Sequence, residues 1–238
     1  MDVGTVRCGS CGAPSEGHLD QCEFCGASIV HALGGLGLLR ANKPQLDKAF
    51  SEFKKALKAN PEDPDAHFGL GAYYMNRELY KEANKHLKKA LEYAPIASQI
   101  YYLLGLNTAL WRGWTNIQVR QHAERAIRLD QNMKEARSLL HIYSGVIRAR
   151  SARGKPQLRE ALNILQKAKD LGVKDHFQYI YFFCGETLEK AQNPENALDM
   201  YRAARDFGAK GAQIHIRLGM IHNRQGHPKL ALQELEKA

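Results

Sequence analysis

The sequence has no long hydrophobic run and no secretory leader. A membrane-spanning helix needs roughly 18 or more consecutive apolar residues. The nearest candidate, residues 29–39, is shorter and contains His31 and three glycines. The N-terminus lacks the basic start, apolar core and small-residue cleavage site of a signal peptide. We therefore expect no membrane span and a cytoplasmic location.

Common catalytic motifs are also missing from the sequence. There is no HExxH pair, no phosphate-cradling glycine loop and no nucleophile elbow. The glycines instead recur at fixed distances along the chain, as described below. We predict that the chain is not an enzyme.

Cysteine is scarce, yet four of the five cysteines form two matched pairs. Cys8, Cys11, Cys22 and Cys25 follow the pattern C-x2-C-x10-C-x2-C, and Gly-Ala comes after each pair. Four thiolates at tetrahedral positions bind Zn²⁺ in a closed structural site that leaves no position for water or substrate. We predict one structural Zn²⁺. An iron site of rubredoxin type, and His18 replacing one cysteine, are the alternatives.

The paired cysteines resemble the zinc ribbon family over residues 8–27, which implies a small four-cysteine module at residues 1–28. This module contains one basic residue, Arg7, against four acidic residues, although the whole chain carries a formal charge of +9. Phosphate contacts need lysine and arginine. The module is therefore predicted to meet a protein surface rather than nucleic acid.

Small residues recur every 34 positions from about residue 30 onward. One set recurs completely 34 residues later: Gly37, Ala49, Phe53, Ala56 and Pro61 return as Gly71, Ala83, Leu87, Ala90 and Pro95. A second set does the same: Gly185, Ala197, Tyr201 and Ala204 return as Gly219, Ala231, Leu235 and Ala238. A fixed period of this length is typical of stacked helical repeats. We expect two amphipathic helices per repeat, with the small residues where their backbones approach closely.

This pattern resembles the tetratricopeptide repeat (TPR) family, most completely at Leu70, Gly71 and Tyr74. The resemblance implies an all-α superhelical solenoid of helix-turn-helix repeats over residues 29–238. We place six repeats, at about 30–63, 64–97, 98–131, 132–172, 178–211 and 212–238. The third is irregular because residues around 111–114 delay its second helix to about 117–129, and the fourth because of extra residues at 148–156. The sequence ends within a repeat, from which we expect a longer protein.

The TPR resemblance implies that the first helices line a concave groove for a peptide or helix of a partner protein. The inward-facing candidates are apolar or aromatic: Leu38, Phe68, Met75, Tyr102, Leu106, Leu110, Tyr179, Phe182, Ile216 and Met220. Such a surface suits an apolar or helical partner segment. Packing of these side chains in the core is the alternative. Glu186 and Glu189 are expected to make the later groove acidic, which would favour a basic residue on the partner.

These patterns together predict an interaction scaffold, with the zinc ribbon either capping the solenoid or docking a second protein. The alternative is binding to RNA or another anionic surface through a basic cluster around one loop. Its possible anion-binding residues are Arg148, Arg150, Arg153, Lys155 and Arg159. The two hypotheses differ in salt dependence, because phosphate binding weakens steeply as ionic strength rises.

Overall fold

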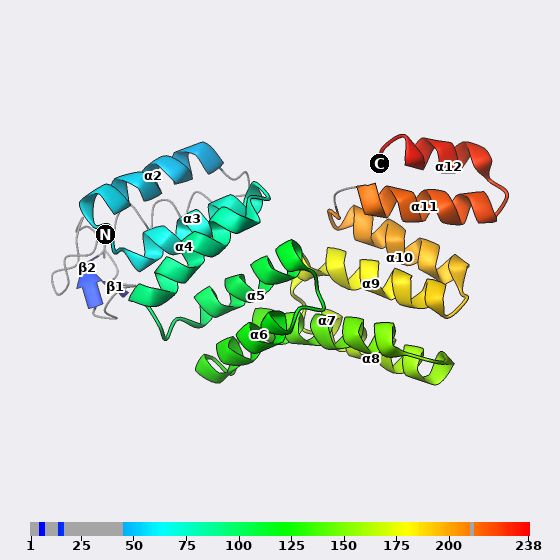
Figure 1. The fold of residues 1–238 in the computed structure, drawn as a ribbon, viewed down its shortest axis with the longest axis horizontal. Helices are drawn as coiled ribbons and strands as arrows, with labels where there is room; N and C mark the ends of the chain where they lie inside the picture. Colours follow the sequence, from blue (N-terminus) through cyan, green and yellow to red (C-terminus); the bar gives the residue numbers. More distant parts are fainter. Residues whose placement is uncertain (1–4, 8–13, 17–44, 210–211) are drawn as a thin grey trace. The chain divides into compact units, whose positions relative to one another are not determined.

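The computed structural model describes residues 5–7, 14–16, 45–209 and 212–238 (Figure 1). The chain divides into two compact units, Met1–Gln131 and Asn132–Ala238, and each is considered by itself. From residue 45 onward the described residues form eleven α-helices and one short 3-10 helix, without strands. This confirms the predicted all-helical repeat region.

The described N-terminal residues form a short antiparallel hairpin. Strand β1 (Thr5–Arg7) pairs with β2 (Pro14–Glu16), and Arg7 lies opposite Pro14. Residues 8–13, between the strands, include the first predicted cysteine pair. All four predicted zinc ligands, Cys8, Cys11, Cys22 and Cys25, lie outside the described residues. The zinc site therefore stays a prediction.

Helices follow one another in hairpin-like pairs within each unit. The first unit contains α2 (Leu46–Ala59), α3 (Pro64–Asn76), α4 (Tyr80–Tyr93), α5 (Ser98–Arg112) and α6 (Ile117–Leu129). The second contains α7 (Lys134–Ser151), α8 (Lys155–Asp170), η1 (Lys174–His176), α9 (Phe177–Lys190), α10 (Pro194–Asp206), α11 (Ala212–Arg224) and α12 (Pro228–Leu235). Neighbouring helices pack along each other in five pairs: α3/α4, α5/α6, α7/α8, α9/α10 and α11/α12.

Close helix approach explains the recurring glycines. A Cβ atom on Gly71 would lie 2.6 Å from the side chain of Leu87 on the partner helix, closer than real side chains pack. The same conflict arises in the second unit at Gly145, Gly185 and Gly219. The alanines of the second helices, such as Ala83 and Ala90, are completely buried. The predicted role of the small residues is confirmed at these positions.

In three helix pairs, α3/α4, α9/α10 and α11/α12, the turn adopts a left-handed backbone at a fixed position. Glu78 has φ of 59°, Gln192 has 61° and Gly226 has 78°. Each lies seven residues after its repeat glycine, Gly71, Gly185 or Gly219. Two of the next helices have proline in their first turn, α10 at Asn193–Pro194 and α12 at Pro228. The sequence thus sets where these three pairs turn.

The core consists of clusters shared between one pair and the next. In the first unit, Leu87 and Ala90 of α4 pack with Ile100 and Leu104 of α5. In the second unit, α10 and α11 share a larger buried cluster: Ala197, Leu198, Tyr201, Ala204, Ile214, Leu218 and Ile221. In these two places a first helix therefore covers the second helix of the preceding pair within its unit.

Candidate functional site

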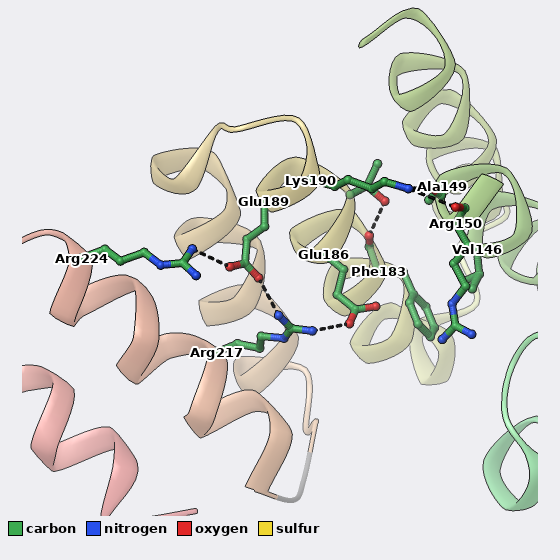
Figure 2. Close-up of a pocket in the computed structure, with 10 residues that line it drawn as sticks. Val146, Ala149, Arg150, Phe183, Glu186, Glu189, Lys190, Arg217 and Arg224 are labelled. Carbon is green, nitrogen blue, oxygen red and sulfur yellow. Dashed lines mark hydrogen bonds and ion pairs between the residues drawn. The ribbon is translucent and has the colours of Figure 1, made fainter. Parts of the chain in front are cut away.

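The second unit contains a hollow of about 460 Å³ (Figure 2). Its walls come from α7, α9 and α11, which are the first helices of three successive pairs. No residue of a second helix lines it. On α9 the lining residues Phe183, Thr187 and Lys190 are spaced by four and three, so they share one helix face. The repeat itself therefore builds the hollow.

Glu189 organises an ion-pair network on one side of the hollow. Its carboxylate accepts a hydrogen bond of 2.6 Å from the Tyr201 hydroxyl and one of 3.4 Å from Arg217, and it pairs with Arg224 at 3.5 Å. Arg217 also donates to Glu186 at 2.9 Å. Figure 2 shows the guanidinium of Arg217 between the two glutamates. Only 11% of the Glu189 side chain is exposed, so this network is shielded more than a typical surface ion pair.

Tyr201 connects this network to the repeat core. Its ring is fully buried and packs where Gly185 leaves room for it. Burial raises the pKa of the Tyr201 hydroxyl well above its usual value, and donation to the Glu189 carboxylate raises it further. The hydroxyl therefore stays protonated and keeps donating to Glu189.

Lys190 fastens α9 to the end of α7. Its ammonium group donates hydrogen bonds of 2.8 Å to the Ala149 carbonyl and 3.0 Å to the Arg150 carbonyl. These carbonyls belong to the last turn of α7, where the helix offers no internal partner. The lysine thus fixes the second wall of the hollow.

The hollow is more basic than the sequence suggested. Its charged lining residues are four basic and two acidic: Arg150, Lys190, Arg217, Arg224, Glu186 and Glu189. The expectation of an acidic later groove is wrong, because both glutamates pair with arginines of α11. A signal for this was present in the sequence. Arg150, Lys190 and Arg224 each lie five residues after a repeat glycine.

Of the predicted groove residues that the structure describes, none lines the hollow. Met220 is 41% exposed and lies between Arg217 and Arg224 in the sequence of α11. Eight others are half-buried: Phe68, Met75, Tyr102, Leu106, Leu110, Tyr179, Phe182 and Ile216. Leu38 lies outside the described residues. Phe68 and Met75 pack partly on the α4–α5 cluster, and Phe182 packs on the α10–α11 cluster, so these three contribute to the core as well as to the surface.

The predicted basic cluster is divided among several environments. Arg148 donates to Glu160 of α8 at 2.7 Å, and Arg150 lines the large hollow. Arg153 and Lys155 line a separate hollow of about 210 Å³, while Arg159 is exposed on α8. The structure thus does not gather the five side chains at one hollow.

Neither a metal site nor a membrane-spanning helix is found among the described residues. No group of three or more histidine, cysteine or acidic side chains among them is placed to hold a metal ion. Cys184 is a free thiol, and burial raises its pKa to about 12. None of the helices in the described ranges has the length and apolar character needed to cross a membrane.

Comparison with known proteins agrees with the helix pairs and their small-residue pattern. Residues 41–106 match the family model described as Tetratricopeptide repeat. The repeat is of TPR type. A solved neighbour, in the crystal structure of the APC/C hetero-tetramer Cut9–Hcn1, has a TM-score of 0.63 and 17% identity. The alignment covers 87% of this chain and 38% of that one.

Two further relatives have the same kind of limited similarity. The structure of the human IFIT1 dimer with m7Gppp-AAAA has a TM-score of 0.59 and 16% identity, with 88% of this chain and 50% of that chain covered. Protein O-mannosyl-transferase TMTC3 of Homo sapiens is 24% identical over 196 residues, which are 81% of this chain and 18% of the relative. The chain therefore spans only a small part of TMTC3. These similarities establish the TPR-type fold but not a shared activity or ligand.

Proposed function

We propose that this TPR-type chain is a protein-interaction scaffold whose first helices bind an apolar or helical segment of a partner protein. The observation that carries the proposal is the hollow lined by α7, α9 and α11. A segment lying across three successive first helices gains contacts from each repeat. Val146 and Phe183 form the apolar floor of the hollow and are only 3% and 7% exposed, so the charged residues make up most of the surface that a segment would contact.

The fixed position of Arg217 supports recognition of a polar group beside the apolar contact. Two of its guanidinium N–H groups are directed at Glu186 and Glu189, and an arginine has five such donors. A side chain held in this way loses little conformational entropy when a ligand binds. Four basic residues against two acidic ones favour a segment whose polar flank is neutral or acidic.

The proposal includes a structural zinc ribbon at residues 1–28, which caps the repeats or docks a second protein. The four-thiolate pattern supports it, as do the paired strands on either side of residues 8–13. We expect one zinc per chain by elemental analysis of the purified protein. A double variant, Cys8→Ser with Cys11→Ser, should lose that zinc. Full retention of zinc in this variant would exclude the proposed ligand set.

Peptide display on the purified chain tests the proposed groove. Peptides selected from a random library should bind with an affinity that falls about tenfold in Arg217→Ala, the size expected for a lost charged hydrogen bond. Arg202→Ala is the matched control, because Arg202 pairs with exposed Asp199 on the second helix α10. Circular dichroism verifies that both variants fold. Equal binding to the two variants would contradict recognition at the hollow.

A further inference from the structure

A second hollow in the second unit is lined by charges of one sign. It has a volume of about 210 Å³, and its three charged lining residues are all cations: Arg153, Lys155 and Lys190. They come from the turn between α7 and α8, the start of α8 and the end of α9. No acidic side chain in the described part of the chain lines it. Its floor is apolar, because Ala152 and Leu158 are only 7% and 4% exposed. We call it the basic hollow.

The two cations nearest the start of α8 have no acidic partner. None of the ion pairs found among the described residues includes Arg153 or Lys155. The acidic residue nearest to them in sequence is Glu160, and its carboxylate pairs with Arg148 instead. Like charges that converge without a counter-charge repel one another, more strongly above an apolar floor than in open water. A bound anion would remove this repulsion.

Lys190 is held in place at the edge of the basic hollow. Its ammonium group has three N–H donors, and two hydrogen bonds bind it to the Ala149 and Arg150 carbonyls. One donor is left for a ligand. A lysine fixed in this way loses little conformational entropy when an anion binds. Lys190 also lines the larger hollow of Figure 2, so the two hollows meet at this side chain.

We propose that the basic hollow binds a phosphate monoester, the phosphoserine or phosphothreonine of the partner segment that occupies the larger hollow. The inference rests on the proposed function, because the segment reaches the basic hollow across Lys190. A phosphate monoester carries a charge of about −1.5 to −2 at neutral pH and three acceptor oxygens, whereas a carboxylate carries a single charge and two oxygens. Three cations therefore match the phosphate better. The planar guanidinium of Arg153 is suited to bind two phosphate oxygens at once.

Inorganic phosphate is the first probe, because it tests the basic hollow without any peptide. Nuclear magnetic resonance of the full chain should show saturable shifts of backbone amides at residues 152–155 and 190–192 when phosphate is added. Chloride at equal ionic strength should not cause them. The double variant Arg153→Ala with Lys155→Ala should bind phosphate about tenfold or more weakly, because two charged hydrogen bonds are lost.

Arg159→Ala with Lys167→Ala is the matched control. Both residues are exposed on the same helix α8 and line neither hollow, and their replacement lowers the net charge by the same amount. This variant should bind phosphate within about twofold of the original chain, since only screened long-range attraction is reduced. Circular dichroism verifies that both double variants fold. Absence of saturable shifts, or equal weakening in the two double variants, would overturn the proposal.

Peptides selected on the larger hollow test whether the phosphate belongs to the partner segment. Phosphoserine is placed in turn at each position of a selected peptide, with serine at the same position as the reference. At one position phosphoserine should raise the affinity about tenfold, and Arg153→Ala with Lys155→Ala should abolish this gain. Arg217→Ala should weaken both forms of the peptide and leave the gain unchanged, because Arg217 does not line the basic hollow.

The outcomes separate this inference from the proposed function. If peptides bind but phosphoserine raises the affinity at no position, the larger hollow still binds a segment and the inference is overturned. If phosphate binds but no peptide is selected, the proposed function fails, and the basic hollow is a site for free phosphate instead.

Discussion

At the scale of single residues, the left-handed turn after α3, α9 and α11 shows how one position controls local strain. Glycine adopts this backbone freely, whereas a residue with a side chain is strained there by about 1–2 kcal/mol. Gln192 and Gly226 occupy the same position in successive repeats. Glycine can therefore be replaced by a residue with a side chain at one of these positions, and introduced at the other, to measure the same backbone strain.

We predict that Gly226→Ala lowers the free energy of unfolding by about 1 kcal/mol, while Gln192→Gly raises it by about 0.5 kcal/mol. The gain is smaller because glycine also increases the entropy of the unfolded chain. Denaturant titration measures both. Gln225→Ala in the same turn is the control: Gln225 is not among the residues with positive φ, so stability should change little. A loss at Gln225 as large as at Gly226 would refute the strain argument.

His176 should make the second unit sensitive to acid. Its side chain is fully buried, Nδ1 lies 2.8 Å from the Ser138 hydroxyl, and burial lowers its pKa to about 4. An unfolded histidine has a pKa of about 6.5. Between pH 6.5 and about 4 the unfolded chain therefore binds a proton that the folded chain excludes, so the stabilising contribution is complete above pH 6.5 and lost as pH falls through this window.

Thermal unfolding of the original chain and of His176→Gln across this pH range tests the effect. The stability difference between the two should shrink as the pH falls. A constant difference would show that His176 is not the group responsible. Asp63 in the first unit changes the stability in the opposite direction. Burial raises the pKa of its carboxyl to about 6, so the folded chain gains stability as the pH falls through this range. The comparison of variant with original removes that contribution.

At the scale of secondary-structure elements, Lys190 supplies hydrogen-bond donors to the end of another helix. We predict that Lys190→Met speeds amide hydrogen exchange in the last turn of α7, because two carbonyl groups there lose their charged donor. Exchange measured by mass spectrometry should change locally. Lys229→Met on α12, also exposed, should leave α7 unaffected. Equal exchange in α7 for the original chain and Lys190→Met would contradict the role of Lys190.

Helices were more predictable than the site they form. The small-residue register predicts the pairing of helices, and even the delayed second helix of the third repeat, expected at about 117–129, is found at Ile117–Leu129. The ion pair between Glu186 and Arg217 was not predicted, because the residues lie on different helices and their approach depends on how α9 and α11 are rotated. The basic position five residues after the repeat glycine was visible in sequence, but only the structure assigns it to a hollow.

At the scale of the whole molecule, each compact unit contains its own buried clusters. We predict that a fragment of residues 132–238 folds by itself, because the α10–α11 cluster and the hollow are made of residues of this unit alone. Circular dichroism should show a helical fragment that unfolds cooperatively. A fragment without cooperative unfolding would mean that the second unit needs the first for stability.

The hydrogen bond between Tyr201 and Glu189 also provides a spectroscopic signal for binding at the hollow. A ligand that draws the Glu189 carboxylate away removes the acceptor of a buried phenol, which shifts the near-ultraviolet absorption of that ring. Both tryptophans, Trp111 and Trp114, belong to the first unit, so a fragment of residues 132–238 has only tyrosine signals in its fluorescence. Difference spectra of this fragment should therefore register occupation of the hollow without any attached dye.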